Sequence, residues 1–142
     1  MAKIRTGDVK VQGLPELSKA LKALGPEAQK ELKETSKKVA TFVAADARSI
    51  ASGLGGVAAK TAPSIRPVGG VNGAGISFGG GAYPFAAGAE FGSFRYKQFQ
   101  PWRGNGPGAG YFVYPAIRQD LDKIEDEYVS GLDDIIKRRF PE

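Results

Sequence analysis

The sequence contains no cysteine and no histidine among its 142 residues. Without cysteine the chain forms no disulfide and no thiolate metal site, and without histidine it lacks the commonest general base and metal ligand. Zinc sites, Ser-His-Asp triads and Cys-His pairs are therefore excluded. Only carboxylate or lysine chemistry is left for an enzyme, so we expect no catalytic residue, no metal and no cofactor.

Long apolar runs are also missing. No stretch approaches the roughly 18–20 consecutive apolar residues of a membrane-spanning helix, so we expect no membrane contact. The N-terminus carries Lys3 and Arg5 with no apolar run behind them, which argues against a signal peptide. We expect the protein to be made and kept in a cytoplasm-like compartment.

Glycine is abundant but unevenly spread, since 16 of the 20 glycines lie between Gly53 and Gly110. Such a stretch favours turns and loops, and the segment 103–110 is predicted to be a flexible loop. The Gly-rich stretches 78–81 and 104–108 lack the strand, lysine and helix order of a phosphate-binding loop. Loop flexibility is therefore favoured over phosphate binding.

Charge is distributed unequally along the chain, whose net charge is +5. Residues 1–62 carry eleven Lys/Arg against six Asp/Glu, residues 63–114 carry four against one, and residues 115–142 carry five against eight. This polarity suits head-to-tail contact between copies or between stacked layers of different proteins. Unrelated solvated faces explain it equally well. The adjacent carboxylates near the C-terminus do not face one another on a helix and make poor acid–base pairs.

Hydrophobic periodicity predicts a single α+β domain over residues 1–142. The expected fold is a small, mainly antiparallel sheet packed by a long N-terminal helix and a C-terminal helix. The last helix is expected to open at Pro115 and to bend at Gly131. Asp46 lies on the apolar stripe of the long helix, where Arg48 or a subunit edge would satisfy it. The other expected elements are a strand at 9–12, helices at 14–24 and 26–50 (followed by a helix-breaking segment at 52–56), hairpin strands at 64–68 and 74–78, and further strands at 83–91 and 96–99.

Basic and aromatic residues occur together in two segments. Four lysines lie on the long helix, and three more cations stand among aromatics between residues 94 and 103. Single-strand binders combine charge and stacking in this way. The helix lysines, however, alternate with glutamates, which makes i,i+4 pairs and partly neutralises that face. Two interpretations of the aromatics stay open, a subunit interface and an aromatic mini-core: Phe94, Tyr96, Phe99, Trp102, Tyr111, Phe112 and Tyr114.

Several different short motifs follow one another in a familiar order along most of residues 9–140. They are Ala62-Pro63, Ala89-Glu90-Phe91-Gly92-Ser93, Gln100-Pro101-Trp102 and Tyr114-Pro115-Ala116. With the Leu-spaced and Ala/Lys helices before them, these motifs resemble the HK97 gp10-like family of tailed-phage proteins. That family is described as head–tail joining or tail-completion proteins.

The resemblance implies a structural virion protein of a tailed bacteriophage, assembled in the host cytoplasm and located at the neck. Its partners would be other copies of itself in a ring, six-fold by the tail's symmetry, with head-side connector proteins and tail tube or terminator proteins on either side. Genomic DNA would be touched only incidentally. The alternatives are a nucleic-acid-binding accessory protein and another tail part, such as a tail terminator or minor tail protein.

The residues that carry the resemblance are also the candidate interface residues. We expect Glu90 and the Phe91-Gly92 pair to support the fold or a subunit edge, with Glu90 pairing with Arg95 or with a neighbouring copy. The full candidate set is Pro63, Glu90, Phe91, Gly92, Arg95, Trp102, Tyr114 and Pro115.

Overall fold

The computed structural model describes residue 23 and residues 25–70, 73–103 and 108–139. The predicted strand at 9–12 and helix at 14–24 lie outside the described residues. Within them the chain is α+β, with a long helix, a two-stranded antiparallel sheet and a C-terminal helix, as predicted. No described helix has the length and apolar content to cross a membrane.

Helix α2 (Pro26–Leu54) is the longest element, with 29 residues. Proline in its first turn needs no backbone N–H donor, which suits the start of a helix. The helix continues through Ser52 and Gly53, because a single glycine costs a helix only about 1 kcal/mol and Ala47 and Ala51 are buried on the same face. It ends within the predicted break at 52–56, at Gly55, whose φ of 71° leaves the right-handed helical region.

Strands β1 (Arg66–Gly70) and β2 (Gly73–Ser77) form an antiparallel hairpin that pairs Arg66 with Ser77. The predicted hairpin is confirmed, although β1 begins two residues later than expected because η1 (Ala62–Ser64) precedes it. The hairpin lies directly on α2. A Cβ added at Gly69 would lie 2.7 Å from the Cα of Lys37, so this close backbone approach requires glycine.

The predicted third and fourth strands are wrong. Tyr83 to Phe85 form a turn, and helix α4 (Ala86–Phe91) follows. The sequence of α4 is rich in alanine and has no β-branched residue, so it favours a helix. Residues 96–99 form a turn that is closed by the Phe99 N–H donating to the Tyr96 carbonyl oxygen. The sheet of the described residues therefore has two strands.

The C-terminal helix is divided into α5 (Val113–Gln119) and α6 (Leu121–Arg139), which meet at Asp120. The helix thus begins two residues before Pro115, and α6 runs without interruption through Gly131, where a bend was expected. Gly131 instead permits close helix packing: a Cβ there would lie 2.5 Å from Oγ1 of Thr35 on α2. The glycine is explained by contact, not by flexibility.

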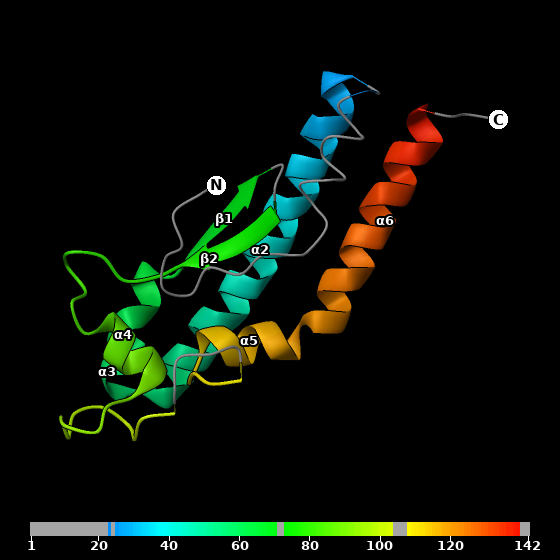
Figure 1. Ribbon diagram of the computed structural model, residues 1–142. Coiled ribbons are helices and arrows are strands. Elements are labelled where there is room, and N and C mark those ends of the chain that lie inside the picture. Colours follow the sequence, from blue (N-terminus) through cyan, green and yellow to red (C-terminus); the bar gives the residue numbers. More distant parts are fainter. Residues whose placement is uncertain (1–22, 24, 71–72, 104–107, 140–142) are drawn as a thin grey trace.

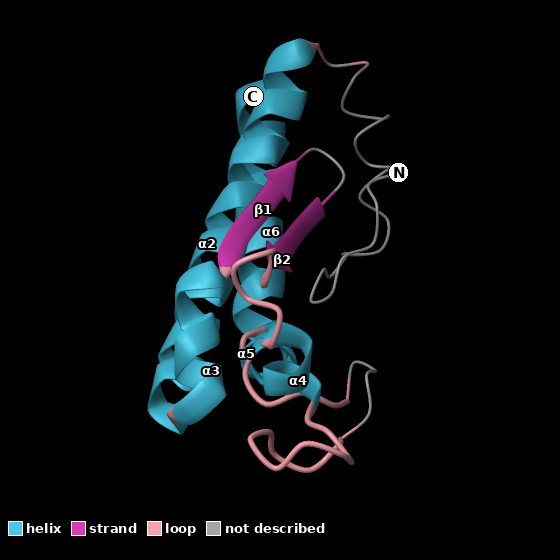
Figure 2. Ribbon diagram, turned by 90° about the vertical axis from the view of Figure 1, so that its left-hand side faces the viewer, coloured by secondary structure: helices cyan, strands magenta, loops and turns pink. Residues whose placement is uncertain are grey.

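Helix α2 lies between the hairpin and α6, and the short helices α3 (Gly56–Thr61), α4 and α5 gather around its C-terminal end (Figures 1 and 2). The Ser36 and Tyr128 hydroxyls form a buried hydrogen bond of 2.8 Å between α2 and α6. The largest fully buried apolar side chains of the core are Leu32, Ile65, Ile76, Phe112, Val113 and Ile135.

Candidate functional site

A buried carboxylate joins α4 to the start of α5. Oε1 of Glu90 accepts hydrogen bonds from the backbone N–H groups of Tyr111 (3.1 Å), Phe112 (2.8 Å) and Val113 (3.0 Å). Oε2 accepts a fourth from the N–H of Tyr114 at 2.9 Å. The first N–H groups of a helix have no partner within the helix, and Phe112 at the N-cap contributes no side-chain cap. Glu90 therefore caps α5 from a distant part of the chain.

The Glu90 carboxyl is removed from solvent, with an exposed fraction of 0%. Burial raises its pKa above the ordinary value, while the four backbone hydrogen bonds act in the opposite direction. Four donors converging on two oxygens, at the positive end of α5, favour the ionised form. The structure does not bring this carboxylate to Arg95, whose guanidinium instead lies 5.9 Å from the ring centroid of Tyr96. The predicted ion pair is wrong because Glu90 points inward.

Two glycines make the junction around Glu90 possible. Gly92 ends α4 with a φ of 84°, and a Cβ there would collide with the carbonyl oxygen of Pro101. Gly110 has a φ of 87°, and a Cβ there would collide with Oε2 of Glu90. Glycine alone adopts this backbone region at low cost and leaves the space open. The Glu-Phe-Gly-Ser motif thus has a conformational basis.

Residues 92–103, here called the aromatic loop, leave this junction and return to it. The Ser93 N–H donates to the Gln100 carbonyl oxygen, and the Arg103 N–H donates to the Phe91 carbonyl oxygen. Oγ of Ser93 accepts hydrogen bonds from the backbone N–H groups of Arg95 and Tyr96. The loop therefore has a defined backbone, although it contains neither helix nor strand.

Arg103 and Tyr111 fix the end of the aromatic loop where it returns to the junction. The Arg103 guanidinium donates to the Gly110 carbonyl oxygen at 3.1 Å and lies 3.7 Å from the ring centroid of Tyr111. The Tyr111 hydroxyl donates to the Pro101 carbonyl oxygen at 2.7 Å. Both ends of the predicted flexible loop 103–110 are thus anchored, and its residues 104–107 lie outside the described part of the chain.

The aromatic residues divide between core and surface. Phe112 is fully buried and meets Phe78 edge-on, and Phe91 packs against Tyr114 with ring centroids 6.0 Å apart. Phe94 and Trp102 instead lie on the surface, 89% and 40% exposed, with ring centroids 5.8 Å apart. The mini-core interpretation therefore holds for one part of the set, and the aromatic loop holds the exposed part, which includes Tyr96.

The stretch of chain that contains the aromatic loop carries an excess of positive charge. Between residues 47 and 119 Glu90 is the sole acidic residue, and it is buried. The same span contains seven cations. Three of them bind carbonyl oxygens, since Arg48 donates to Ile65, Arg103 to Gly110 and Arg118 to Ala109. The seven are Arg48, Lys60, Arg66, Arg95, Lys97, Arg103 and Arg118.

The structure brings five of the eight candidate residues into one place. Glu90, Phe91 and Gly92 meet Tyr114 directly or through the loop backbone, and Pro115 follows in the first turn of α5. Arg95 and Trp102 lie on the aromatic loop. Pro63 is exposed in η1, which packs on α3.

A second carboxyl pair lies where α5 meets α6. Asp120 is buried, and its carboxyl shares a hydrogen bond with that of Asp46 on α2. Burial and then Asp46 raise the pKa of Asp120 to about 6, while Lys123 lowers it. Arg48 is directed to the Ile65 carbonyl oxygen, so it is not the partner predicted for Asp46. The sequence indicated Asp46 by its place on an apolar stripe, but gave no sign of Asp120.

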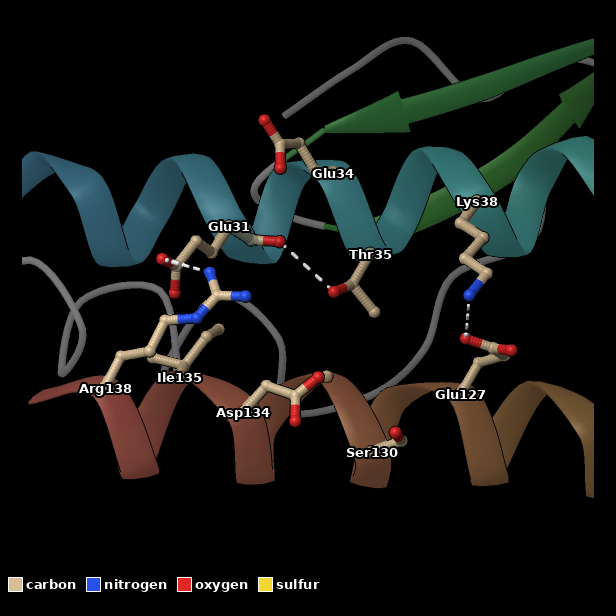
Figure 3. A pocket seen from close by; sticks show the side chains of 10 residues that line it. Glu31, Glu34, Thr35, Lys38, Glu127, Ser130, Asp134, Ile135 and Arg138 are labelled. Atoms are coloured by element: carbon tan, nitrogen blue, oxygen red, sulfur yellow. Dashed lines mark hydrogen bonds and ion pairs between the residues drawn. The ribbon is translucent and has the colours of Figure 1, made fainter. Parts of the chain in front are cut away.

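A polar groove of about 200 Å³ lies between α2 and α6 (Figure 3). Ion pairs bridge it at two points, Lys38 to Glu127 at 3.3 Å and Arg138 to Glu31 at 2.9 Å. Thr35 lies between them and donates to the Glu31 carbonyl oxygen. The described residues contain no group of three or more acidic side chains placed to hold a metal ion. The groove is thus part of the packing contact between α2 and α6, held together by the two ion pairs.

Comparison with known proteins gives no relative: no family model, no curated protein and no solved structure matches this chain.

Proposed function

We propose that this protein is a structural component of a tailed-phage virion that joins the DNA-filled head to the tail. The observation that carries the proposal is the junction at Glu90. Five residues of the short motifs that resemble the head–tail joining family, 90–92 and 114–115, meet there. The motifs are far apart in sequence, yet they serve one structural unit, which supports a shared architectural origin for their order.

The chemistry of the junction supports a structural role over a catalytic one. A general acid or base must be within hydrogen-bond reach of a substrate. The Glu90 carboxylate is buried, and both of its oxygens accept backbone N–H groups. Its arrangement fixes the chain around α5 and presents the aromatic loop outward.

The test is electron microscopy of a lysate from the parent phage with this gene interrupted by a nonsense codon. We expect DNA-filled heads and separate finished tails, with joined particles restored when the intact gene is supplied in trans. Normal particles without the gene product would overturn the proposal. Joined particles with tails of uncontrolled length would instead identify a tail terminator.

Nucleic-acid binding is the second candidate, favoured by the positive surface and exposed aromatics of the loop. Phosphate contacts make affinity fall steeply with salt. Binding of a labelled single-stranded oligonucleotide that weakens about tenfold or more between 50 and 200 mM salt, and that is lost in Trp102→Ala, would favour this role. Salt-independent or absent binding would exclude it.

A further inference from the structure

The aromatic loop presents apolar rings on a fixed backbone. Phe94, Tyr96 and Trp102 are all exposed, and the turn at Ser93 and the contact between the Phe94 and Trp102 rings hold them together. Large contiguous apolar patches on a soluble protein mark contact surfaces. Arg95, Lys97 and Arg103 accompany the rings, and residues 92–103 include no carboxylate. The loop is therefore suited to an apolar surface that is bordered by negative charge.

Helix α6 carries such a surface beside the face that packs on α2. Leu121, Val129 and Ile136 are each more than half exposed. Val129 and Ile136 are seven residues apart and lie along one side of the helix. Each directly follows a buried residue of the α2-facing side, Tyr128 or Ile135, so their side lies about 100° around the helix from that contact. Leu121 is exposed where the helix begins. The helical period places three exposed carboxylates along this apolar strip. The α6 flank is thus Leu121, Val129 and Ile136 with Asp122, Glu125 and Asp126.

One copy cannot join these two surfaces. The aromatic loop lies at the end of the molecule formed by α3 and α4, while α6 extends from α5 along α2 toward the opposite end (Figures 1 and 2). The two surfaces are chemically complementary, because the loop carries aromatic side chains and cations while the flank carries aliphatic side chains and carboxylates. Complementary charge of this kind selects partners and fixes register.

A nucleic acid is a less suitable partner for these two surfaces than a second copy of the chain. It would leave the aliphatic strip on α6 uncovered, and its phosphates would be repelled by the carboxylates there. On the loop itself, the Arg103 guanidinium is already held by the Gly110 carbonyl oxygen and the Tyr111 ring. A second copy covers both surfaces at once.

We propose that the aromatic loop of one copy docks on the α6 flank of a second copy. The contact is heterologous, so each copy keeps one unused loop or flank and further copies add head to tail until the assembly closes. The inference rests on the proposed function in one respect, since it names the surfaces through which copies in the neck would meet. Its test uses purified protein alone, so its failure leaves the nonsense-codon result unaffected.

The experiment is sedimentation equilibrium of the full chain and of two double variants. Phe94→Ser/Trp102→Ser removes the loop contact, and Val129→Ser/Ile136→Ser removes the flank contact. We expect the wild type to associate, and each variant alone to associate at least about tenfold more weakly, because central aromatic and aliphatic anchors dominate interfaces. An equimolar mixture of the two variants should restore a 1:1 dimer, since one still has its flank and the other its loop.

Each other result overturns the proposal. A monomeric wild type at millimolar concentration would do so, and one that binds single-stranded DNA in a salt-dependent way would identify nucleic acid as the occupant. If either variant alone associated as strongly as the wild type, the contact would be symmetric, loop with loop or flank with flank. Val68→Ser, which alters an exposed apolar residue on β1 outside both surfaces, is the matched control.

Covalent capture provides an independent readout, because the natural chain has no cysteine. Phe94→Cys and Val129→Cys proteins, mixed and oxidised mildly, should form the mixed disulfide dimer in preference to either symmetric one. Equal amounts of all three dimers would contradict the proposed docking.

Discussion

Oε1 of Glu90 accepts a 2.8 Å hydrogen bond from the backbone N–H of Phe112, and both residues are completely buried. An ionised side chain in such a place is usually paired with a cation. Here the compensation comes from the backbone at the start of a helix. The contact joins residues 22 positions apart, so one side chain determines where α5 begins and how it sits against α4.

Replacing Glu90 with alanine should destabilise the protein by at least about 3 kcal/mol, because each buried N–H left without an acceptor costs about 1–3 kcal/mol. Glu90→Gln should cost less, since its carbonyl oxygen keeps part of the acceptor set while its NH₂ group opposes the Tyr114 N–H. Urea denaturation followed by circular dichroism measures both. Glu34→Ala, which alters an exposed glutamate on α2 outside the aromatic loop and the α6 flank, is the control and should change little. Equal midpoints for Glu90→Ala and wild type would refute the capping role.

Asp120 should make stability depend on pH. Its pKa is about 6 in the folded protein against 3.8 for the ordinary group. The folded state therefore binds the proton more tightly, so this contribution is present below pH 3.8 and is lost as pH rises to about 6. The facing groups are Asp46 on α2, which raises the pKa, and Lys123 on α6, which lowers it.

Asp120→Asn should remove that loss and stabilise the protein at pH 7 by about 1–3 kcal/mol, given 1.36 kcal/mol per pKa unit. At pH 4 the gain should be close to zero. Urea midpoints of the two proteins from pH 4 to 8 give the difference, in which the other carboxylates cancel. A gain that is constant across this range would show that Asp120 does not titrate as described.

Gly131→Ala should destabilise the protein by about 1–3 kcal/mol because the new methyl group overpacks the contact with α2. Its Cβ would lie 2.5 Å from Oγ1 of Thr35. Gly53→Ala is the matched control, since a Cβ there meets nothing within 4 Å in α2. It should stabilise by about 0.5–1 kcal/mol through helix propensity. Thermal melting that stabilised both variants alike would contradict the close approach, and adding Thr35→Ala should partly rescue Gly131→Ala.

Tyr128→Phe should destabilise the protein by about 1–2 kcal/mol, since the buried Ser36 hydroxyl loses its partner. The double variant Ser36→Ala/Tyr128→Phe should cost less than the sum of the two single changes. A double-mutant cycle in urea measures the coupling. Strict additivity would mean that the hydrogen bond contributes nothing.

Hydrophobic periodicity correctly predicted two kinds of element: a helix with a long apolar face, and strands that pair with their neighbour in the sequence. The 26–50 helix and the hairpin were confirmed because a wide buried stripe and Gly-separated strands leave few alternatives. The strand predicted at 83–91 was wrong because the apolar pattern of so short a stretch does not distinguish strand from helix. The alanine-rich composition of 86–91 favours the helix, which ends at Gly92.

The site was predictable only in part. The short motif around Glu90 indicated a structural role, which the buried cap now specifies. The direction of the side chain was not foreseeable, because its partners are backbone groups that carry no sequence signature. Asp120 was missed for a related reason: among several neighbouring acids, only the fold determines which one turns inward.

The anchoring of residues 111–114 by Glu90 also has an evolutionary consequence. The chain between Glu90 and residue 111 begins and ends at fixed positions. Closing a longer loop costs only about 0.6 kcal/mol for each doubling of its length. Insertions and deletions there would leave the helical frame intact. Descendants of this protein are thus free to acquire new outer contacts by changing one loop, while Glu90 keeps the fold they inherit.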